Sequence, residues 1–352
     1  MASVILALKK RGVEYKIVGT GQHKVDEILN NLGIVDDVEY ILPPPLKGSI
    51  SGASMLQGIA FSIDALRRIH KKIVTERPNL VLYHGDTMTT VTAALGTNIT
   101  WGKRWKTGHV EAGLRSYCLW EPFPEEISRV IADHLSDVLF APTERAKQNL
   151  QREGIVKNVY VTGNTSVDAV KLALKRARNI EIPWNEYILV NVHRFENIKS
   201  KKRLRTIVSA VEEISRKFDG DVVWPMHSTT ERMLKSFGLW EIVENAAMVT
   251  DALPYPKFIK ALSRARVVLT DGGSIQEESV TLKIPAVILR KRTERPEGLE
   301  TPYNYLVGID KDKIVKSVLK ILDHPPRWKG MNPYGDGRAG EKIADLVLKY
   351  LS

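Results

Sequence analysis

Short apolar runs alternate with longer amphipathic stretches along almost the whole chain. The runs are rich in β-branched residues, as buried strands are, and the stretches between them repeat apolar residues at helical spacing. Most runs are apolar on both faces, which is typical of parallel strands covered by helices on both sides. The predicted strands lie near residues 15–18, 80–83, 107–110, 138–140, 159–162, 188–192, 222–226, 248–250, 267–270 and 286–289, and the longest predicted helices run over 55–75 and 201–218. The pattern therefore predicts an α/β protein with the same plan in both halves.

A chain of 352 residues is longer than the roughly 250 to 300 at which a single core stops growing, so two domains are expected. The segment 163–167 is polar, contains a glycine and follows a predicted strand, which favours a hinge there. We expect one Rossmann-like domain over 1–166, a second over 167–335, and a C-terminal helix over 336–352 that packs back on the first. Ligands of open parallel sheets bind at the carboxyl ends of the strands. The two domains should therefore face a shared interdomain cleft.

The charge balance favours anionic ligands without indicating a nucleic acid. There are 52 lysines and arginines against 41 aspartates and glutamates, a formal net charge of +11. The basic residues are scattered, the densest run at 199–205 fits the solvated start of a helix, and no nucleic-acid-binding motif accompanies it. Binding of nucleic acid is therefore not expected.

Nothing in the sequence indicates a membrane protein or a secreted one. No apolar run approaches the roughly 20 residues of a membrane-spanning helix, and no signal-peptide pattern opens the chain. Cys118 is the single cysteine, which excludes an internal disulfide and fits a reducing compartment. We therefore expect a cytoplasmic protein with no membrane partner.

Acidic side chains follow two predicted strands of the first half. Asp86 comes just after the strand near 80–83, and Glu111 just after the strand near 107–110. Both should lie at the ligand-binding edge of the sheet. Positions i and i+2 of a strand face the same side, so His84 and His109 could join these carboxylates in a four-ligand metal site. The two histidines could equally orient the carboxylates.

Further polar residues follow strands of the second half or open helices. Glu125 opens a predicted helix after a proline-rich loop, where the helix dipole alone would favour a carboxylate. His193 follows the strand near 188–192. The turn Gly272-Gly273-Ser274 opens another helix, whose free amides suit a phosphate group. A glycine turn alone is a weak signal.

Taken together, the motifs of this chain resemble the non-hydrolysing UDP-N-acetylglucosamine 2-epimerase family over nearly its full length. They are His-Gly-Asp-Thr, His-Val-Glu-Ala-Gly-Leu-Arg, Pro-Phe-Pro-Glu-Glu, His-Arg-x-Glu-Asn, Gly-x-Ile-Gln-Glu-Glu and Thr-Glu-Arg-Pro-Glu-Gly, in the order and at the spacing of the family. The resemblance implies a two-domain fold like that of the GT-B glycosyltransferases. It also implies interconversion of UDP-N-acetylglucosamine (UDP-GlcNAc) and UDP-N-acetylmannosamine (UDP-ManNAc) by a homodimer, without a metal or other cofactor.

This reaction places clear demands on its catalytic groups. The proton on C2 of the sugar is not next to a carbonyl, so its removal alone would leave an unstabilised carbanion. If UDP leaves C1 as the proton is taken, the intermediate is a neutral glycal, to which UDP can add again. Acid/base groups must therefore lie near C2, and the departing diphosphate must be stabilised. The resemblance assigns proton transfer to Asp86, Glu111 and Glu125, and assistance to the departing diphosphate to His193.

The resemblance also implies two sets of binding residues. The first set would bind the nucleotide, with Arg295 and Ser274 at the phosphates, Glu278 at the ribose, Phe258 on the uracil and Gly273 in the helix-opening turn. The second set resembles an activating site of bacterial relatives and consists of Gln22, Arg194 and His227. Val25 stands where those relatives carry another glutamine, so regulation is left open.

The chain departs from the family at its beginning. Met1 corresponds to a position inside the first helix of the family, after its first strand and its Gly-Thr-Arg-Pro-Glu turn. Without that strand two neighbouring strand edges should be unpaired, and our hypothesis is that a functional form starts upstream. Three other activities stay open: a hydrolysing epimerase that releases N-acetylmannosamine, a catalytically impaired nucleotide-sugar-binding protein, and a glycosyltransferase, in which Asp86 and Glu111 would have no obvious task.

Overall fold

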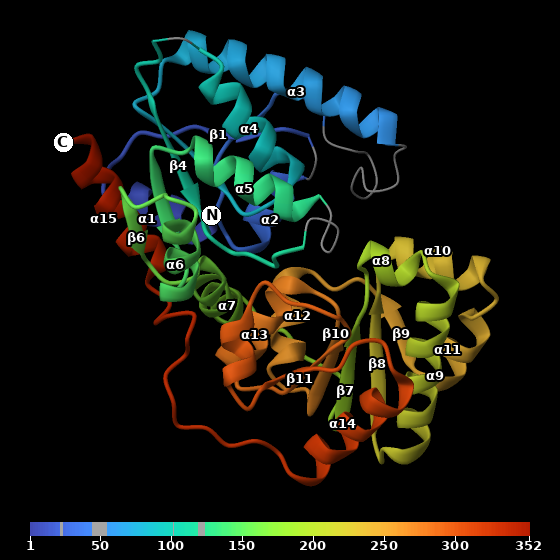
Figure 1. Cartoon of the computed structure of the whole chain (residues 1–352). Coiled ribbons are helices and arrows are strands. Elements are labelled where there is room, and N and C mark those ends of the chain that lie inside the picture. Colours follow the sequence, from blue (N-terminus) through green and yellow to red (C-terminus); the bar gives the residue numbers. More distant parts are fainter. Residues whose placement is uncertain (22–23, 44–54, 101, 119–123) are drawn as a thin grey trace. The chain divides into compact units, whose positions relative to one another are not determined.

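The structure is a computed structural model that describes residues 1–21, 24–43, 55–100, 102–118 and 124–352 (Figure 1). The chain divides into two compact units. Unit 1 consists of Met1–Ala169 and Tyr334–Ser352, and unit 2 consists of Val170–Pro333. Within the described ranges, no helix has both the length and the apolarity needed to cross a membrane.

Unit 1 contains two parallel sheets among its described residues. The smaller pairs β1 (Ile17–Gly19) with β2 (Val38–Tyr40), and the larger has the order β3 (Leu80–His84), β4 (Lys106–Val110), β5 (Val138–Ala141) and β6 (Val159–Val161). Its helices are α1 (Ala2–Lys10), α2 (Val25–Asn31), α3 (Met55–Glu76), α4 (Met88–Asn98), α5 (Glu125–Leu135), α6 (Glu144–Arg152) and α15 (Ala339–Leu351), and α7 (Thr165–Arg176) begins in it.

The alternation of side chains along β5 explains how the larger sheet of unit 1 is covered. Val138 and Phe140 point to one face, where they pack with apolar residues of α1 and α15. Leu139 and Ala141 point to the other face and pack with residues of α6. Because successive residues of a strand face opposite sides, a run of four apolar residues builds a core on both faces. The C-terminal helix α15 is thereby part of unit 1.

Unit 2 is built on one parallel sheet of six strands in the order β12-β11-β10-β7-β8-β9. Numbered within the unit, this is the strand order 3-2-1-4-5-6 of dinucleotide-binding folds, whose order reverses between the first and fourth strands, here β7 and β10. The strands are β7 (Tyr187–Asn191), β8 (Asp221–Met226), β9 (Met248–Asp251), β10 (Val267–Thr270), β11 (Ala286–Ile288) and β12 (Asn304–Leu306). Ligands of this fold bind where the order reverses.

Helices cover both faces of the unit 2 sheet, with α9 and α11 on one side and α12 and α13 on the other (Figure 1). The buried face of α9 places Leu204, Ile207 and Val211 in one apolar cluster with Val190 and Trp224 of the sheet. The helices are α8 (Phe195–Ile198), α9 (Lys201–Lys217), α10 (Ser228–Ser236), α11 (Trp240–Ala246), α12 (Tyr255–Leu262), α13 (Gly273–Leu282), α14 (Lys311–Asp323) and the 3-10 helix η2 (Pro296–Glu300).

The predicted α/β class with parallel sheets is confirmed, and each predicted strand overlaps an observed one. Two strands were not predicted. They are β2 and β12, which are three residues long and only partly buried, so no apolar run marks them in the sequence. Part of the predicted hinge 163–167 is helical, because the side chain of Asn164 accepts a hydrogen bond from Ser166 N (2.8 Å) and opens α7 there. The division between the units falls after Ala169, inside that helix.

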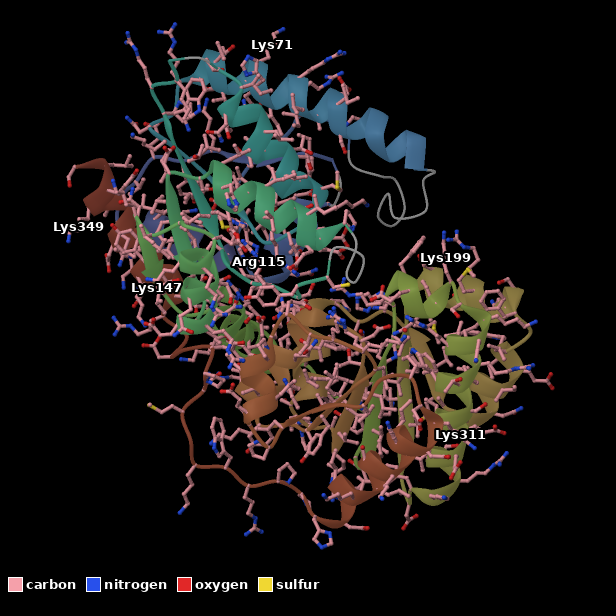
Figure 2. All side chains as sticks on the ribbon, viewed as in Figure 1. Lys71, Arg115, Lys147, Lys199, Lys311 and Lys349 are labelled. Carbon is pink, nitrogen blue, oxygen red and sulfur yellow. The ribbon has the colours of Figure 1, made fainter. Side chains whose placement is uncertain are left out.

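The basic side chains are spread over many elements. The exposed lysines Lys71 on α3, Lys199 after α8 and Lys349 on α15 belong to three separate helical regions (Figure 2). The lysine run that begins at Lys201 lies in the first turns of α9. The positive net charge is therefore not concentrated in one element.

Candidate functional site

Asp86 and Glu111 follow strands that are neighbours in the unit 1 sheet. The register of β3 and β4 pairs His84 with Val110, so both loops leave the carboxyl edge of the sheet side by side. Gly85 N donates to Val110 O (3.0 Å), and Gly85 has a φ of +71°, which favours glycine. A β-carbon on Gly85 would lie 3.3 Å from Glu111 Oε2. The two predicted catalytic loops are therefore in contact.

Glu111 has an unusual backbone conformation that directs its side chain. Its φ is +72°, a left-handed value that few residues other than glycine adopt, and such values concentrate at functional sites. The conformation lets the amides of Glu111 and Ala112 both donate to Phe140 O, each at 3.1 Å. The carboxylate then accepts a hydrogen bond from Asn164 Nδ2 (3.4 Å) and lies 3.7 Å from His84 Nε2. Its position is thus set by three neighbouring segments of unit 1.

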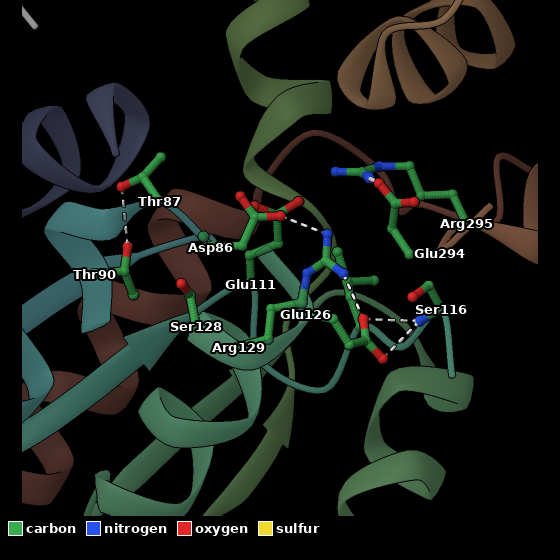
Figure 3. Close-up of polar contacts among 12 residues, drawn as sticks. Asp86, Thr87, Thr90, Glu111, Ser116, Glu126, Ser128, Arg129, Glu294 and Arg295 are labelled. Carbon is green, nitrogen blue, oxygen red and sulfur yellow. Dashed lines mark hydrogen bonds and ion pairs between the residues drawn. The ribbon is translucent and has the colours of Figure 1, made fainter. Parts of the chain in front are cut away.

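The first turn of α5 adds Glu125 and a residue that sequence reasoning missed. Arg129 lies one helical turn after Glu125 and is 1% exposed. It donates through Nη2 to Asp86 Oδ2 (2.5 Å) and through Nη1 to Glu126 Oε2 (2.8 Å) (Figure 3). The only signal in the sequence was its spacing of four residues from Glu125, which places both on one face of a helix.

His109, one member of the alternative metal site, is fully buried in a hydrogen-bond network. Its Nδ1 lies 2.7 Å from Asp133 Oδ1, and its Nε2 lies 2.8 Å from Gly85 O. Arg115 also contacts Asp133, with Nη1 2.7 Å from Oδ2. Burial opposes ionisation of Asp133, but His109 and Arg115 outweigh it and lower the pKa of this carboxyl. Because both ring nitrogens have partners, His109 cannot join His84, Asp86 and Glu111 as a metal ligand in this arrangement.

In unit 2, His193 lies where the strand order reverses between β7 and β10. Asp271, at the end of β10, has no exposed surface and accepts hydrogen bonds from the backbone amides of His193 (3.0 Å) and Arg194 (3.1 Å). It also accepts one from Asn197 Nδ2 (3.0 Å). A single buried carboxylate therefore fixes the loop that carries His193.

A bridging amide sets the orientation of two imidazoles. Asn191 Oδ1 lies 3.0 Å from His193 Nδ1, and Asn191 Nδ2 lies 3.4 Å from His227 Nε2. The amide oxygen accepts only from a protonated nitrogen and the amide nitrogen only donates, so His193 carries its proton on Nδ1. Desolvation by the surrounding residues lowers the pKa of His193 to about 4, together with the charges of His227 and Arg194 and against the opposing effect of Asp271. The ring is therefore neutral at physiological pH, with its Nε2 lone pair unprotonated.

The predicted nucleotide-binding residues Phe258, Ser274 and Glu278 line one cavity of about 220 Å³ in unit 2. His193 and His227 line the same cavity. Glu278 is buried, and this burial raises its pKa to about 7 even though Tyr255 Oη donates a hydrogen bond to its Oε1 (3.0 Å). Tyr255 was not predicted; it lies on α12, and it shares a hydrogen bond with a residue of α13.

Arg295 lies against the first turn of α13. A β-carbon on Gly273 would come within 2.8 Å of Arg295 Nη1 and 3.1 Å of Glu294 Oε1, so the close approach requires glycine. Arg295 is buried; it donates through Nε to Glu277 Oε1 (2.7 Å) and through Nη1 to Glu294 Oε1 (Figure 3). These two carboxylates hold the guanidinium beside the amino end of α13.

The residues predicted to form an activating site lie in different parts of the chain. His227 lines the cavity described above, with its ring centroid 5.0 Å from that of His193. Arg194 Nη2 lies 3.3 Å from the position of a β-carbon on Gly273, so it approaches the same turn as Arg295. Gln22 lies outside the described residues.

Comparisons with known proteins agree with one another. A family model described as UDP-N-acetylglucosamine 2-epimerase matches residues 6–348. The UDP-N-acetylglucosamine 2-epimerase of Methanocaldococcus jannaschii is 36% identical over 99% of this chain and 94% of its own length, and that of Escherichia coli is 33% identical over 99% and 94%. The crystal structure of the M. jannaschii protein, in complex with UDP-GlcNAc and UDP, superposes with a TM-score of 0.87 at 34% identity and covers 99% of this chain and 95% of that one.

Proposed function

The chain belongs to the UDP-N-acetylglucosamine 2-epimerase family, and from this premise we propose that it interconverts UDP-GlcNAc and UDP-ManNAc by eliminating UDP and adding it back. In the forward direction a base takes the C2 proton while the C1–O bond breaks, giving UDP and a neutral glycal. Addition of UDP to C1, with a proton returned to the other face of C2, gives the epimer. No water is consumed and no redox change occurs.

The observation that carries this proposal is the pair of adjacent carboxylates in unit 1. Asp86 and Glu111 follow neighbouring strands, and their loops touch at Gly85. Inversion at C2 requires one group to remove a proton and another to deliver one, so a single carboxylate is not enough. Glu125 is the third candidate, at the amino end of α5.

The cavity of unit 2 has the groups that a uridine diphosphate requires. Phe258 offers an aromatic surface for the base, and Glu278 offers an oxygen for the ribose hydroxyls. The amino end of α13 provides backbone amides and the positive end of a helix dipole for the diphosphate. UDP and UDP-GlcNAc are the ligands of the M. jannaschii complex. These features support the assignment of nucleotide binding to unit 2 and of proton transfer to unit 1.

His193 fits a role in the departure of the diphosphate. Its neutral ring can take up a proton at Nε2 when the anionic diphosphate enters the cavity, because a nearby negative charge favours the imidazolium. The protonated Nε2 can then donate a hydrogen bond to the oxygen that leaves C1, where negative charge develops. Asn191 keeps the other ring nitrogen occupied throughout.

Incubation with UDP-GlcNAc in heavy water tests the proposal. We expect UDP-ManNAc and recovered UDP-GlcNAc that carry deuterium at C2, with no accumulation of free UDP. Asp86→Asn should slow this incorporation about 100-fold to 10,000-fold and still bind UDP, since general acid–base groups contribute effects of that size. Accumulation of free N-acetylmannosamine with UDP would instead identify a hydrolysing enzyme, and binding without any turnover would identify a binding protein.

A further inference from the structure

We propose that Arg129 is a positioning residue that fixes the carboxylate of Asp86 for proton transfer. This inference rests on the proposed function, in which Asp86 belongs to the proton-transfer group. Arg129 contacts Glu126 of its own helix α5 and Asp86 in the loop after β3, and Glu126 in turn accepts hydrogen bonds from the loop after β4. No sequence motif assigned it a role.

The contact between Arg129 and Asp86 leaves one carboxylate oxygen available for chemistry. Arg129 Nη2 donates to Asp86 Oδ2, whereas no residue of the described segments forms a hydrogen bond with Oδ1. The side chain of Asp86 is 25% exposed and that of Arg129 only 1%, so solvent can reach the carboxylate but not the guanidinium. Arg129 therefore restrains the rotation of the carboxylate and leaves Oδ1 as the atom that would exchange a proton with C2.

The second arm of Arg129 ties this contact to the other catalytic loop. Its Nη1 donates to Glu126, which is 2% exposed and accepts hydrogen bonds from the backbone amides of Ser116 and Tyr117, each at 3.0 Å (Figure 3). Ser116 and Tyr117 lie in the loop that follows Glu111 in the chain. The guanidinium thus links the loop of Asp86, the loop after Glu111 and the first turn of α5, where Glu125 lies.

The planar guanidinium is suited to this task in a way that an ammonium group is not. Its two terminal nitrogens point in fixed directions and serve two carboxylates at once, and its charge is retained at every relevant pH. The two carboxylates, of Asp86 and Glu126, belong to different segments. The guanidinium therefore sets the distance between those segments as well as the orientation of Asp86. A lysine could reach one carboxylate but would not hold the two in a fixed relation.

The test compares Arg129→Met and Arg129→Lys with the double variant Glu126→Gln/Arg129→Met. The single Met variant leaves the buried carboxylate of Glu126 without its cationic partner, whereas the double variant removes both charges. Lys103→Met is the matched control, because Lys103 forms a partly buried ion pair with Asp137 (3.0 Å) just before β4, at the opposite end of that strand. For each protein we would measure kcat, KM, the UDP dissociation constant, the melting temperature and the kinetic isotope effect with deuterium at C2 of UDP-GlcNAc.

A positioning role predicts a specific pattern of losses. In Arg129→Met and in the folded double variant kcat should fall about 100-fold, the cost of a small misplacement of a catalytic group. KM and the UDP dissociation constant should stay within about threefold, and the isotope effect should rise because proton transfer becomes rate-limiting. Arg129→Lys should recover part of kcat. Lys103→Met should lower the melting temperature while kcat and the isotope effect stay at the wild-type values.

Two results would overturn the inference, and one readout separates it from the proposed function. A double variant that keeps kcat within threefold of wild type, or one whose kcat falls with no change in isotope effect, would show that Arg129 is not needed to position Asp86. Carboxyl-carbon NMR of Asp86 does not depend on turnover. If the wild type proves inactive, the proposed function fails, whereas the chemical shift of the Asp86 carboxyl carbon at pH 7 should still change once Arg129 is replaced. An unchanged chemical shift contradicts the contact itself.

Discussion

Glu278 illustrates how burial changes the chemistry of a single residue. It is 3% exposed, and the only hydrogen bond that its carboxyl accepts from the described segments is donated by Tyr255 Oη. Burial disfavours the charged form and raises its pKa to about 7. Near neutral pH the group is therefore divided between a carboxylate that only accepts hydrogen bonds and an acid that can also donate one. Both forms can bind a ribose hydroxyl.

This raised pKa predicts how stability depends on pH. Between pH 4.5 and about 7 the folded protein keeps a proton on Glu278 that the unfolded chain has lost. The contribution of this group to folding stability is therefore complete below pH 4.5 and is lost as pH rises to about 7. Glu278→Gln has no carboxyl group to ionise, so over this pH range we expect it to lose up to about 3 kcal/mol less folding stability than the wild type. Melting temperatures from pH 5 to pH 8 should therefore fall less in Glu278→Gln than in wild type. Glu241→Gln, at an exposed glutamate of α11, should follow the wild-type curve; parallel curves for all three proteins would contradict the raised pKa.

At the residue scale, the sequence predicted catalytic candidates better than the residues that support them. Asp86 and Glu111 could be predicted because they directly follow apolar strands and sit in specific motifs. Arg129 is 43 residues from Asp86 in the chain, and Tyr255 is 23 from Glu278. Such contacts depend on how separate helices pack, which no local spacing encodes. The roles of the catalytic residues themselves are still predictions.

At the scale of elements, the amino end of α13 combines a helix dipole with a buried arginine. Arg295 approaches the helix only because Gly273 lacks a β-carbon, and Glu277 and Glu294 hold the guanidinium there. Since both carboxylates are buried, Arg295 cannot move aside without breaking its ion pairs. A side chain at position 273 should therefore displace Arg295 or the first turn of α13.

Replacing this glycine tests the phosphate-binding role of the turn. In Gly273→Ala the new methyl group would displace Arg295 or the first turn of α13, and we expect the UDP dissociation constant to rise at least about tenfold, or about 1.4 kcal/mol. Gly238→Ala is the control, because Gly238 has a φ of +67° and nothing within 4 Å of an added β-carbon. It should cost about 1 to 2 kcal/mol of stability through backbone strain, with unchanged UDP affinity by calorimetry. Equal affinities in both variants would refute the role.

Secondary structure was predictable where burial leaves a mark in the sequence. Strands buried on both faces, such as β5 and β7, appear as apolar runs, whereas β2 and β12 are short and partly exposed. The segment 163–167 was predicted as a hinge, but its glycine and polar residues suit both a loop and the start of a helix, and the helix α7 begins at Thr165. A side-chain cap from Asn164 selects the helix.

At the scale of the whole molecule, the two units carry different parts of the proposed reaction. Unit 2 has an unbroken six-stranded sheet, and its cavity lies at the reversal of strand order. Unit 1 has its strands in two separate sheets among the described residues, with β1 and β2 apart from β3 to β6. Composition and periodicity predicted an α/β protein with parallel sheets. The family, and with it the substrate, came from the order and spacing of motifs.

The central claim is that UDP detaches from the sugar and then adds back to it, and an oxygen-isotope experiment tests this most directly. UDP-GlcNAc would be labelled with oxygen-18 in the bridge between C1 and the β-phosphorus. If the C1–O bond breaks and UDP is retained, the β-phosphate can rotate, and recovered UDP-GlcNAc should carry label in non-bridging positions without accumulating free UDP. Epimerisation in which all label stays in the bridge would contradict the account.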